Sequence, residues 1–319
     1  MNINHSEKFS AYCFVNFSVS PQVPDSLKLG NGLWMLSRLP IEISDHWRDG
    51  LGSWKLEDIE RCNFVLATTV PSRAPQNFDH ENMHLIRRLK YLLDGLLLQG
   101  VPYYETGFSL SGANVDGDIQ IRDFRELPYY VPSYDLPCLQ VGITEIKCAT
   151  SLAEQLELIA QLGEDWARLR RGLNALSRGS EETGGGDRLH QFARGLEALV
   201  KPNIGNTKTQ FTHRAQTFAR AGLETRNILL QIFDVRSQVE HMHSPLNALD
   251  GTEEERIAVA NRRTRQADIL SRFALRRVLQ SDNLLEVFRT DSNIDAFWRM
   301  NDHDRVRMWG NRIDLVKIP

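Results

Sequence analysis

The sequence predicts an α+β domain over residues 1–150, followed by an all-α domain over residues 151–319. A chain of 319 residues is longer than one typical hydrophobic core supports, so two domains are expected. The first half contains segments in which apolar and polar residues alternate, as they do in strands. In the second half, apolar residues recur at helical spacing instead.

Local patterns predict each element of the first half. The alternation over residues 9–19 indicates a strand with one buried face, and further strands are expected near 33–37, 62–69 and 138–147. Residues 80–99 follow the N-cap residue Asp79 with apolar side chains at helical spacing, which predicts a helix. Residues 106–123 read as a β-hairpin around an Asp-Gly turn.

The second half is predicted to be helical throughout, with one interruption. Ser151 and Glu154 match a capping box, so a helix is expected from there to about Leu176. Residues 177–187 are rich in Gly, Ser and Glu, which predicts a flexible loop. Helical spacing then predicts helices over about 187–200, 208–221, 223–243, 253–280 and 292–300.

Composition and motifs exclude several classes of protein. No apolar run approaches the roughly 18 residues of a membrane span, and the first residues lack the pattern of a signal peptide. The four cysteines have no metal-ligand spacing, which is typical of a cytoplasmic protein. No dinucleotide-binding, P-loop, zinc-protease or serine-hydrolase motif occurs. We therefore expect no metal, no cofactor and no membrane association.

Basic residues are distributed unevenly along the chain. Residues 151–319 contain 25 Lys and Arg, of which 22 are arginine. Arginine suits planar, bidentate contacts to phosphate better than lysine does. It is also a common residue on solvated helix surfaces, so the enrichment by itself is weak support for a phosphate-binding role.

A short segment at the end of one predicted helix carries a candidate catalytic pattern. Arg236 is followed by His241 and His243, and Pro245 ends the helix soon after. On a regular helix Arg236 and His243 share a face, and His241 joins them only if the last turn loosens. Glu240, four residues from Arg236, is spaced to pair with it.

The residue types at this helix end suit chemistry on a phosphodiester. An imidazole can take a proton from a ribose 2′-OH or give one to a leaving oxygen. An arginine can hold the phosphate and offset charge that develops during transesterification. The structural alternative is a surface ion pair beside two histidines favoured at a helix C-terminus.

The pattern resembles the HEPN family, in particular its Apea-like branch. The family motif is Arg, four to six residues, then His, near the end of a core helix, and residues 234–241 (Asp-Val-Arg-Ser-Gln-Val-Glu-His) fit it. Residues 188–199 look like the opening helix of the family, 208–221 like its second helix, and 256–279 like the helix after the motif. The resemblance covers about residues 187–285.

The resemblance implies a HEPN-like helical bundle that forms a homodimer with paired motifs across the two-fold axis. Many members resemble metal-independent endoribonucleases that serve as toxins or antiviral-defence effectors. Carried onto this chain, Arg236 would bind the phosphate and His241 would transfer protons, with His243 as the alternative to His241. Ser237 or Glu197 would be the supporting polar group. The alternative implied function is a non-catalytic HEPN-like module that binds a nucleotide, RNA or a protein partner.

Residues 1–150 match no family that we can name. Because an effector of this kind needs control, the expected role of this domain is to sense a trigger through a regulatory ligand or protein. Its tryptophans and Tyr129-Tyr130 could stack on a base or a partner, although core packing is the more common role of such side chains.

Overall fold

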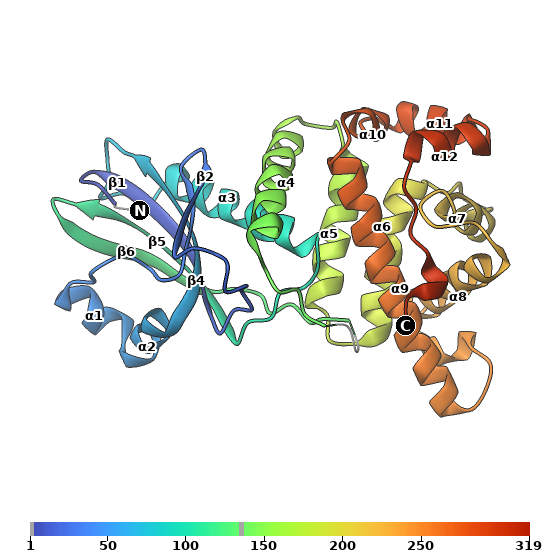
Figure 1. Cartoon of the computed structure of the whole chain (residues 1–319), viewed down its shortest axis with the longest axis horizontal. Helices are drawn as coiled ribbons and strands as arrows, with labels where there is room; N and C mark the ends of the chain where they lie inside the picture. Colours follow the sequence, from blue (N-terminus) through green and yellow to red (C-terminus); the bar gives the residue numbers. More distant parts are fainter. Residues whose placement is uncertain (1–2, 134–136) are drawn as a thin grey trace. The chain divides into compact units, whose positions relative to one another are not determined.

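The computed structural model describes residues 3–133 and 137–319 of the chain. The chain divides into two compact units (Figure 1). The first unit comprises residues up to 130 together with 138–154, and the second comprises the described residues of 131–137 together with 155–319. An antiparallel sheet region followed by a mostly helical part confirms the predicted α+β and all-α classes.

The first unit is built on an antiparallel sheet whose strand order is β2-β3-β4-β1-β5-β6. The strands are β1 (Glu7–Val15), β2 (Ser26–Gly30), β3 (Leu33–Leu36), β4 (Cys62–Pro71), β5 (Thr106–Val115) and β6 (Asp118–Glu126). The helices that cover it are α1 (Asp45–Leu51), α2 (Ser53–Arg61), α3 (His80–Leu97) and the first part of α4 (Ile143–Gln161).

Both faces of the sheet are buried, which corrects the expectation that the first strand has one buried face. One face of β1 carries Phe9, Ala11 and Cys13, in a cluster that also includes side chains of α1 and α2. The other face carries Tyr12 and Phe14, which pack toward α3. Because β1 lies in the middle of the sheet between β4 and β5, helices cover it on both sides and the side chains on both of its faces are buried.

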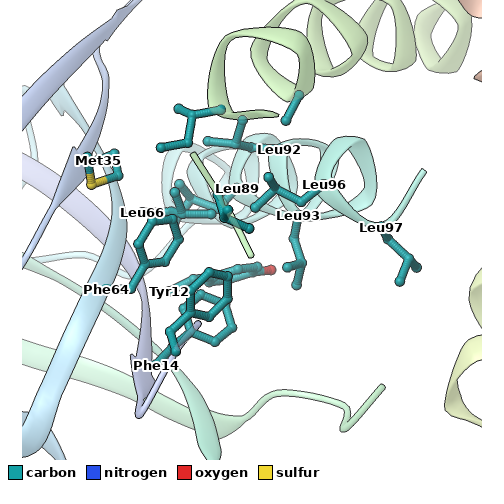
Figure 2. Close-up of a cluster of buried hydrophobic side chains, with 14 of the residues drawn as sticks. Tyr12, Phe14, Met35, Phe64, Leu66, Leu89, Leu92, Leu93, Leu96 and Leu97 are labelled. Carbon is teal, nitrogen blue, oxygen red and sulfur yellow. The ribbon is translucent and has the colours of Figure 1, made fainter. Parts of the chain in front are cut away.

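Helix α3 begins where the sequence predicts, because Asp79 forms a capping box with the first turn. Figure 2 shows its leucines meeting the aromatic side chains of β1 and β4. The ammonium group of Lys8, fully buried on β1, lies 2.7 Å from Asp79 and 2.9 Å from Glu81. This ion-pair cluster ties the start of α3 to the central strand.

The predicted hairpin is confirmed, but the predicted last strand is wrong. Strands β5 and β6 pair through a turn in which Asp116 and Gly117 both have positive φ, as a type I′ turn requires. Over residues 138–147, Leu139 and Val141 form only isolated bridges, and α4 begins at Ile143. Leu139 and Val141 pack against the core from the segment before α4, and Ile146 and Ala149 of α4 are buried in the same cluster.

The second unit is a set of packed helices around α6 (Figure 1). Its elements are α5 (Ala167–Glu181), α6 (Gly185–Val200), α7 (Thr207–Ala215), α8 (Leu223–Glu240), η1 (Pro245–Ala248), α9 (Glu253–Leu279), α10 (Asp282–Val287), α11 (Asp291–Arg299), α12 (Asp302–Trp309) and η2 (Leu315–Lys317). The predicted helices after residue 187 are therefore present, with somewhat different ends.

The helix predicted from Ser151 to about Leu176 is two helices. Ser151 and the expected boundary at residue 150 both lie inside α4, which ends at Gln161. Trp166 then adopts a left-handed conformation as the N-cap of α5, and its indole nitrogen donates to the carbonyl oxygen of Leu285, 2.8 Å away. The chain turns here because this tryptophan is anchored against α10.

The flexible loop predicted over residues 177–187 is wrong. Helix α5 continues to Glu181 and α6 begins at Gly185, so the connection is only residues 182–184. Gly179 is buried against Phe192, where an added Cβ would lie 2.7 Å from a ring carbon. The small residues of this segment allow α5 and α6 to approach closely, which composition alone cannot distinguish from flexibility.

A buried polar network holds residues 131–133 within the second unit. The Arg188 guanidinium donates to the carbonyl oxygens of Val131 and Pro132, at 2.7 and 2.9 Å. The Ser133 hydroxyl donates to Asp268, which is also bonded to Arg272. Asp268 and Arg272 form a buried ion pair, and the two carbonyl oxygens accept from Nη1 and Nη2 of the buried Arg188 guanidinium.

Replacing Gly179 by alanine should destabilise the second unit by about 1–3 kcal/mol, because the new methyl group overlaps the Phe192 ring. Thermal or urea unfolding of the full chain measures the change. Gly222→Ala is the matched control, since nothing lies within 4 Å of the added carbon there. A Gly179→Ala protein as stable as the control would contradict the close packing of α5 on α6.

Candidate functional site

Helix α8 positions Arg236 at the edge of the core. The residues before it (Ile228, Leu229, Ile232, Phe233 and Val235) are buried, while the Arg236 side chain keeps 13% of its surface exposed. The helix ends at Glu240 through a Schellman motif, in which Met242 has φ of 60° and the His243 amide donates to the Gln238 carbonyl oxygen. The helix therefore unwinds just before Pro245.

Two carboxylates hold the Arg236 guanidinium. Its Nη2 donates to Glu197 Oε2 of α6 at 3.0 Å, and its Nη1 donates to Glu240, one turn further along α8. The guanidinium also lies over the Phe233 ring, 5.7 Å from the centroid. The pairing predicted from the spacing of Arg236 and Glu240 is present, and Glu197 joins it from another helix.

The structure does not bring the predicted histidines to this ion pair. His241 and His243 are exposed at the end of α8, and among the described residues neither imidazole bonds to Arg236. Ser237 is half-buried and, within the same residues, its hydroxyl makes no bond to Arg236. The candidate residues thus separate into an ion-pair cluster (Arg236, Glu197, Glu240) and an exposed helix end that carries the imidazoles.

Burial shifts the pKa of two groups beside Arg236. Burial raises the pKa of Glu197 above its usual value, although the nearby Arg236 opposes the shift. Burial lowers the pKa of His190, and the positive charges of Arg236 and Arg194 lower it further. Residues 190, 194 and 197 lie on one side of α6, three or four positions apart. The sequence reasoning did not single out His190, although this spacing from Glu197 was a usable signal.

A cavity of about 430 Å³ in the second unit opens beside this cluster. Its volume lies in the range of ligand-binding pockets. Five of its lining residues are arginines, and one is acidic, so it is strongly positive. The lining side chains come from α5, α6, α8, the segment after α6 and the first residue of α7: Arg168, Arg171, Asn174, Ala175, Arg178, Gln191, Arg194, Glu197, Ala198, Pro202, Thr207 and Arg236. We call it the arginine cavity.

The arginine cavity is suited to anions. Guanidinium groups on three helices can bind phosphate oxygens through paired N–H donors. Of the residues in the predicted site, Arg236 and Glu197 line it, whereas His241 and His243 are not among its described lining residues. Within residues 3–133 and 137–319, no group of three or more His, Cys, Asp or Glu side chains is placed to hold a metal ion.

Comparison of the chain with protein-family models, with curated proteins and with solved structures gave no match. In the described part of the chain, no helix combines the length and the apolar character needed to cross a bilayer.

Because the pKa of His190 is lowered in the folded state, this residue should make stability depend on pH. Its contribution is present above the ordinary value of 6.5 and is lost as the pH falls through the folded-state pKa. His190→Gln should therefore reduce the drop in Tm between about pH 7.5 and 5. The exposed His303, replaced in the same way, is the control. An unchanged profile in His190→Gln would contradict the assignment.

Proposed function

We propose that the chain is a metal-independent endoribonuclease of HEPN type that acts as a homodimer, as a toxin or an antiviral-defence effector. One observation carries the proposal. Arg236 is fixed by Glu197 at the wall of an arginine-lined cavity, on the same helix whose end presents two exposed imidazoles. A held cation, a cavity suited to anions and proton-transfer groups at the end of the same helix are the parts that phosphodiester transesterification needs.

In the proposed reaction, the ribose 2′-oxygen attacks the adjacent phosphorus and the bond from phosphorus to the 5′-oxygen breaks. The proton of the 2′-OH passes to an imidazole, and the imidazolium so formed gives a proton to the departing 5′-oxygen, which returns the imidazole to its neutral form. The products are a 2′,3′-cyclic phosphate and a 5′-hydroxyl. Arg236 offsets the charge that develops on the phosphoryl oxygens, and the need for a 2′-OH restricts the reaction to RNA.

The proposed homodimer supplies what one chain lacks. In the single chain the imidazoles do not contact Arg236, so a second copy that places its own helix end near the cavity would complete the site. Met242, 94% exposed between the two histidines, lies on the helix end that the second copy would contribute. The first unit is the proposed regulatory part, acting through a ligand or protein.

A second candidate function is a non-catalytic helical module that binds RNA, a nucleotide or a protein partner. It is favoured by the two carboxylates that already neutralise Arg236 and by the separation of the imidazoles from it. In this alternative the arginine cavity would bind the ligand without cleaving it.

Loss of the catalytic imidazole should reduce RNA cleavage on the order of 10²–10⁴-fold. His241→Ala and His243→Ala are both exposed changes that should leave Tm unchanged, so each serves as the folding control of the other. We expect His241→Ala to abolish cleavage of total cellular RNA, with chelator present throughout. If His243→Ala reduces RNA cleavage more than His241→Ala does, His243 is the catalytic imidazole instead.

Arg236→Lys tests the phosphate contact while it keeps the positive charge opposite Glu197. If each of the three single variants, Arg236→Lys, His241→Ala and His243→Ala, cleaves RNA at the wild-type rate, the site assignment is wrong. Absence of cleavage by the wild-type chain, with RNA still bound, would establish the non-catalytic alternative.

A further inference from the structure

One face of α5 is lined with arginine and points to a function that the Arg-His motif does not include. Arg168, Arg171 and Arg178 all line the arginine cavity, and Asn174 lies between them. They extend over about 15 Å of helix, at 1.5 Å per residue. Arg194 of α6 lines the same cavity. We call Arg171, Arg178 and Arg194 the free arginine group.

Within the described residues, no side chain of the free arginine group forms an ion pair or a hydrogen bond with a carboxylate, in contrast to Arg168 and Arg236. Arg194 lies close enough to Glu197 to lower the pKa of that carboxyl, but it is not bonded to it. Arg168 is bonded to Asp291 at 3.1 Å, and Arg236 is bonded to Glu197 and Glu240. All three side chains of the group are exposed, so their donors are accessible. Like charges held close together repel, and a bound anion removes that cost.

The residues that line the cavity suit the phosphate backbone of a nucleic acid better than its bases. None of its described lining residues is aromatic, so it offers no ring on which a base could stack. Guanidinium groups spread along a helix match several phosphates in succession rather than one. Phosphate contacts of this kind position a strand without reading its sequence.

We propose that the free arginine group holds consecutive phosphates of single-stranded RNA, next to the linkage that Arg236 engages. This inference rests on the proposed function, because it takes RNA as the substrate class. The group binds the strand independently of its base sequence, and it supplies affinity while Arg236 and an imidazole supply the reaction.

The test measures binding of a fluorescent 2′-O-methyl oligouridylate of about 12 nucleotides to the full chain. This probe cannot be cleaved by 2′-OH attack, so binding is separated from reaction. Arg171→Gln/Arg178→Gln removes two cavity arginines. Arg226→Gln/Arg299→Gln is the matched control, because it removes the same charge from exposed arginines of the second unit outside the cavity. Inorganic triphosphate, added as competitor, tests whether a free polyphosphate occupies the cavity instead.

We expect the cavity variant to bind the probe at least about tenfold more weakly than the control, with oligouridylate and oligoadenylate affected equally. The slope of log affinity against log salt should fall by about 1.4, from roughly 0.7 for each lost contact to a single strand. Triphosphate should compete only at concentrations far above those of the probe.

Equal affinities of the cavity variant and the control would overturn the inference. So would triphosphate that competes as well as the probe, because the occupant would then be a small anion. The two proposals fail separately. If the wild-type chain does not cleave RNA but the cavity variant loses affinity, only the nuclease proposal fails. If cleavage is present and the cavity variant binds normally, only this inference fails.

Discussion

The close contact between α5 and α6 is the constraint on which the second unit depends. A Cβ on Gly172 would lie 2.9 Å from the Cβ of Ala198, and Gly179 is similarly close to Phe192. Larger side chains would force the helices apart, so the small residues fix their separation. That separation places the arginines of α5 opposite Arg194 and Glu197. As a result, these side chains line a cavity. Packing in the core thus determines the electrostatics of the surface beside it.

Most of the fold could be predicted from local patterns, because caps and turns act within a few residues. The helix after Asp79 and the hairpin at Asp116-Gly117 are examples. The wrong predictions concern segments whose structure depends on contacts with residues far away in the sequence. Residues 138–147 alternate like a strand, but find no full strand partner and lead into α4. The segment around Gly179 looks like a loop in composition, and only its contact with Phe192 shows that Gly179 is a packing position.

The candidate site could be predicted only in part. Spacing along one helix predicts the pair of Arg236 and Glu240, and family resemblance pointed to Glu197. The arginine cavity could not be predicted, because its lining comes from α5, α6 and α8 and depends on how they pack. The spacing of His190 from Glu197 could have indicated this residue, but the lowering of its pKa could not be predicted, because it arises from burial and from the charge of Arg236. The position of the imidazoles depends on a left-handed residue, Met242, where glycine is more usual.

The network around Arg188 makes the second unit discontinuous in sequence. Val131, Pro132 and Ser133 precede α4 in the chain, yet they satisfy Arg188 and Asp268 deep among α5, α6 and α9. A recombinant fragment starting at residue 151 would contain the whole arginine cavity but would leave the buried Arg188 guanidinium without two of its acceptors, at a cost of about 1–3 kcal/mol for each lost bond. A fragment of the second unit should therefore include residues 131–133, or these three residues should be added as a separate peptide.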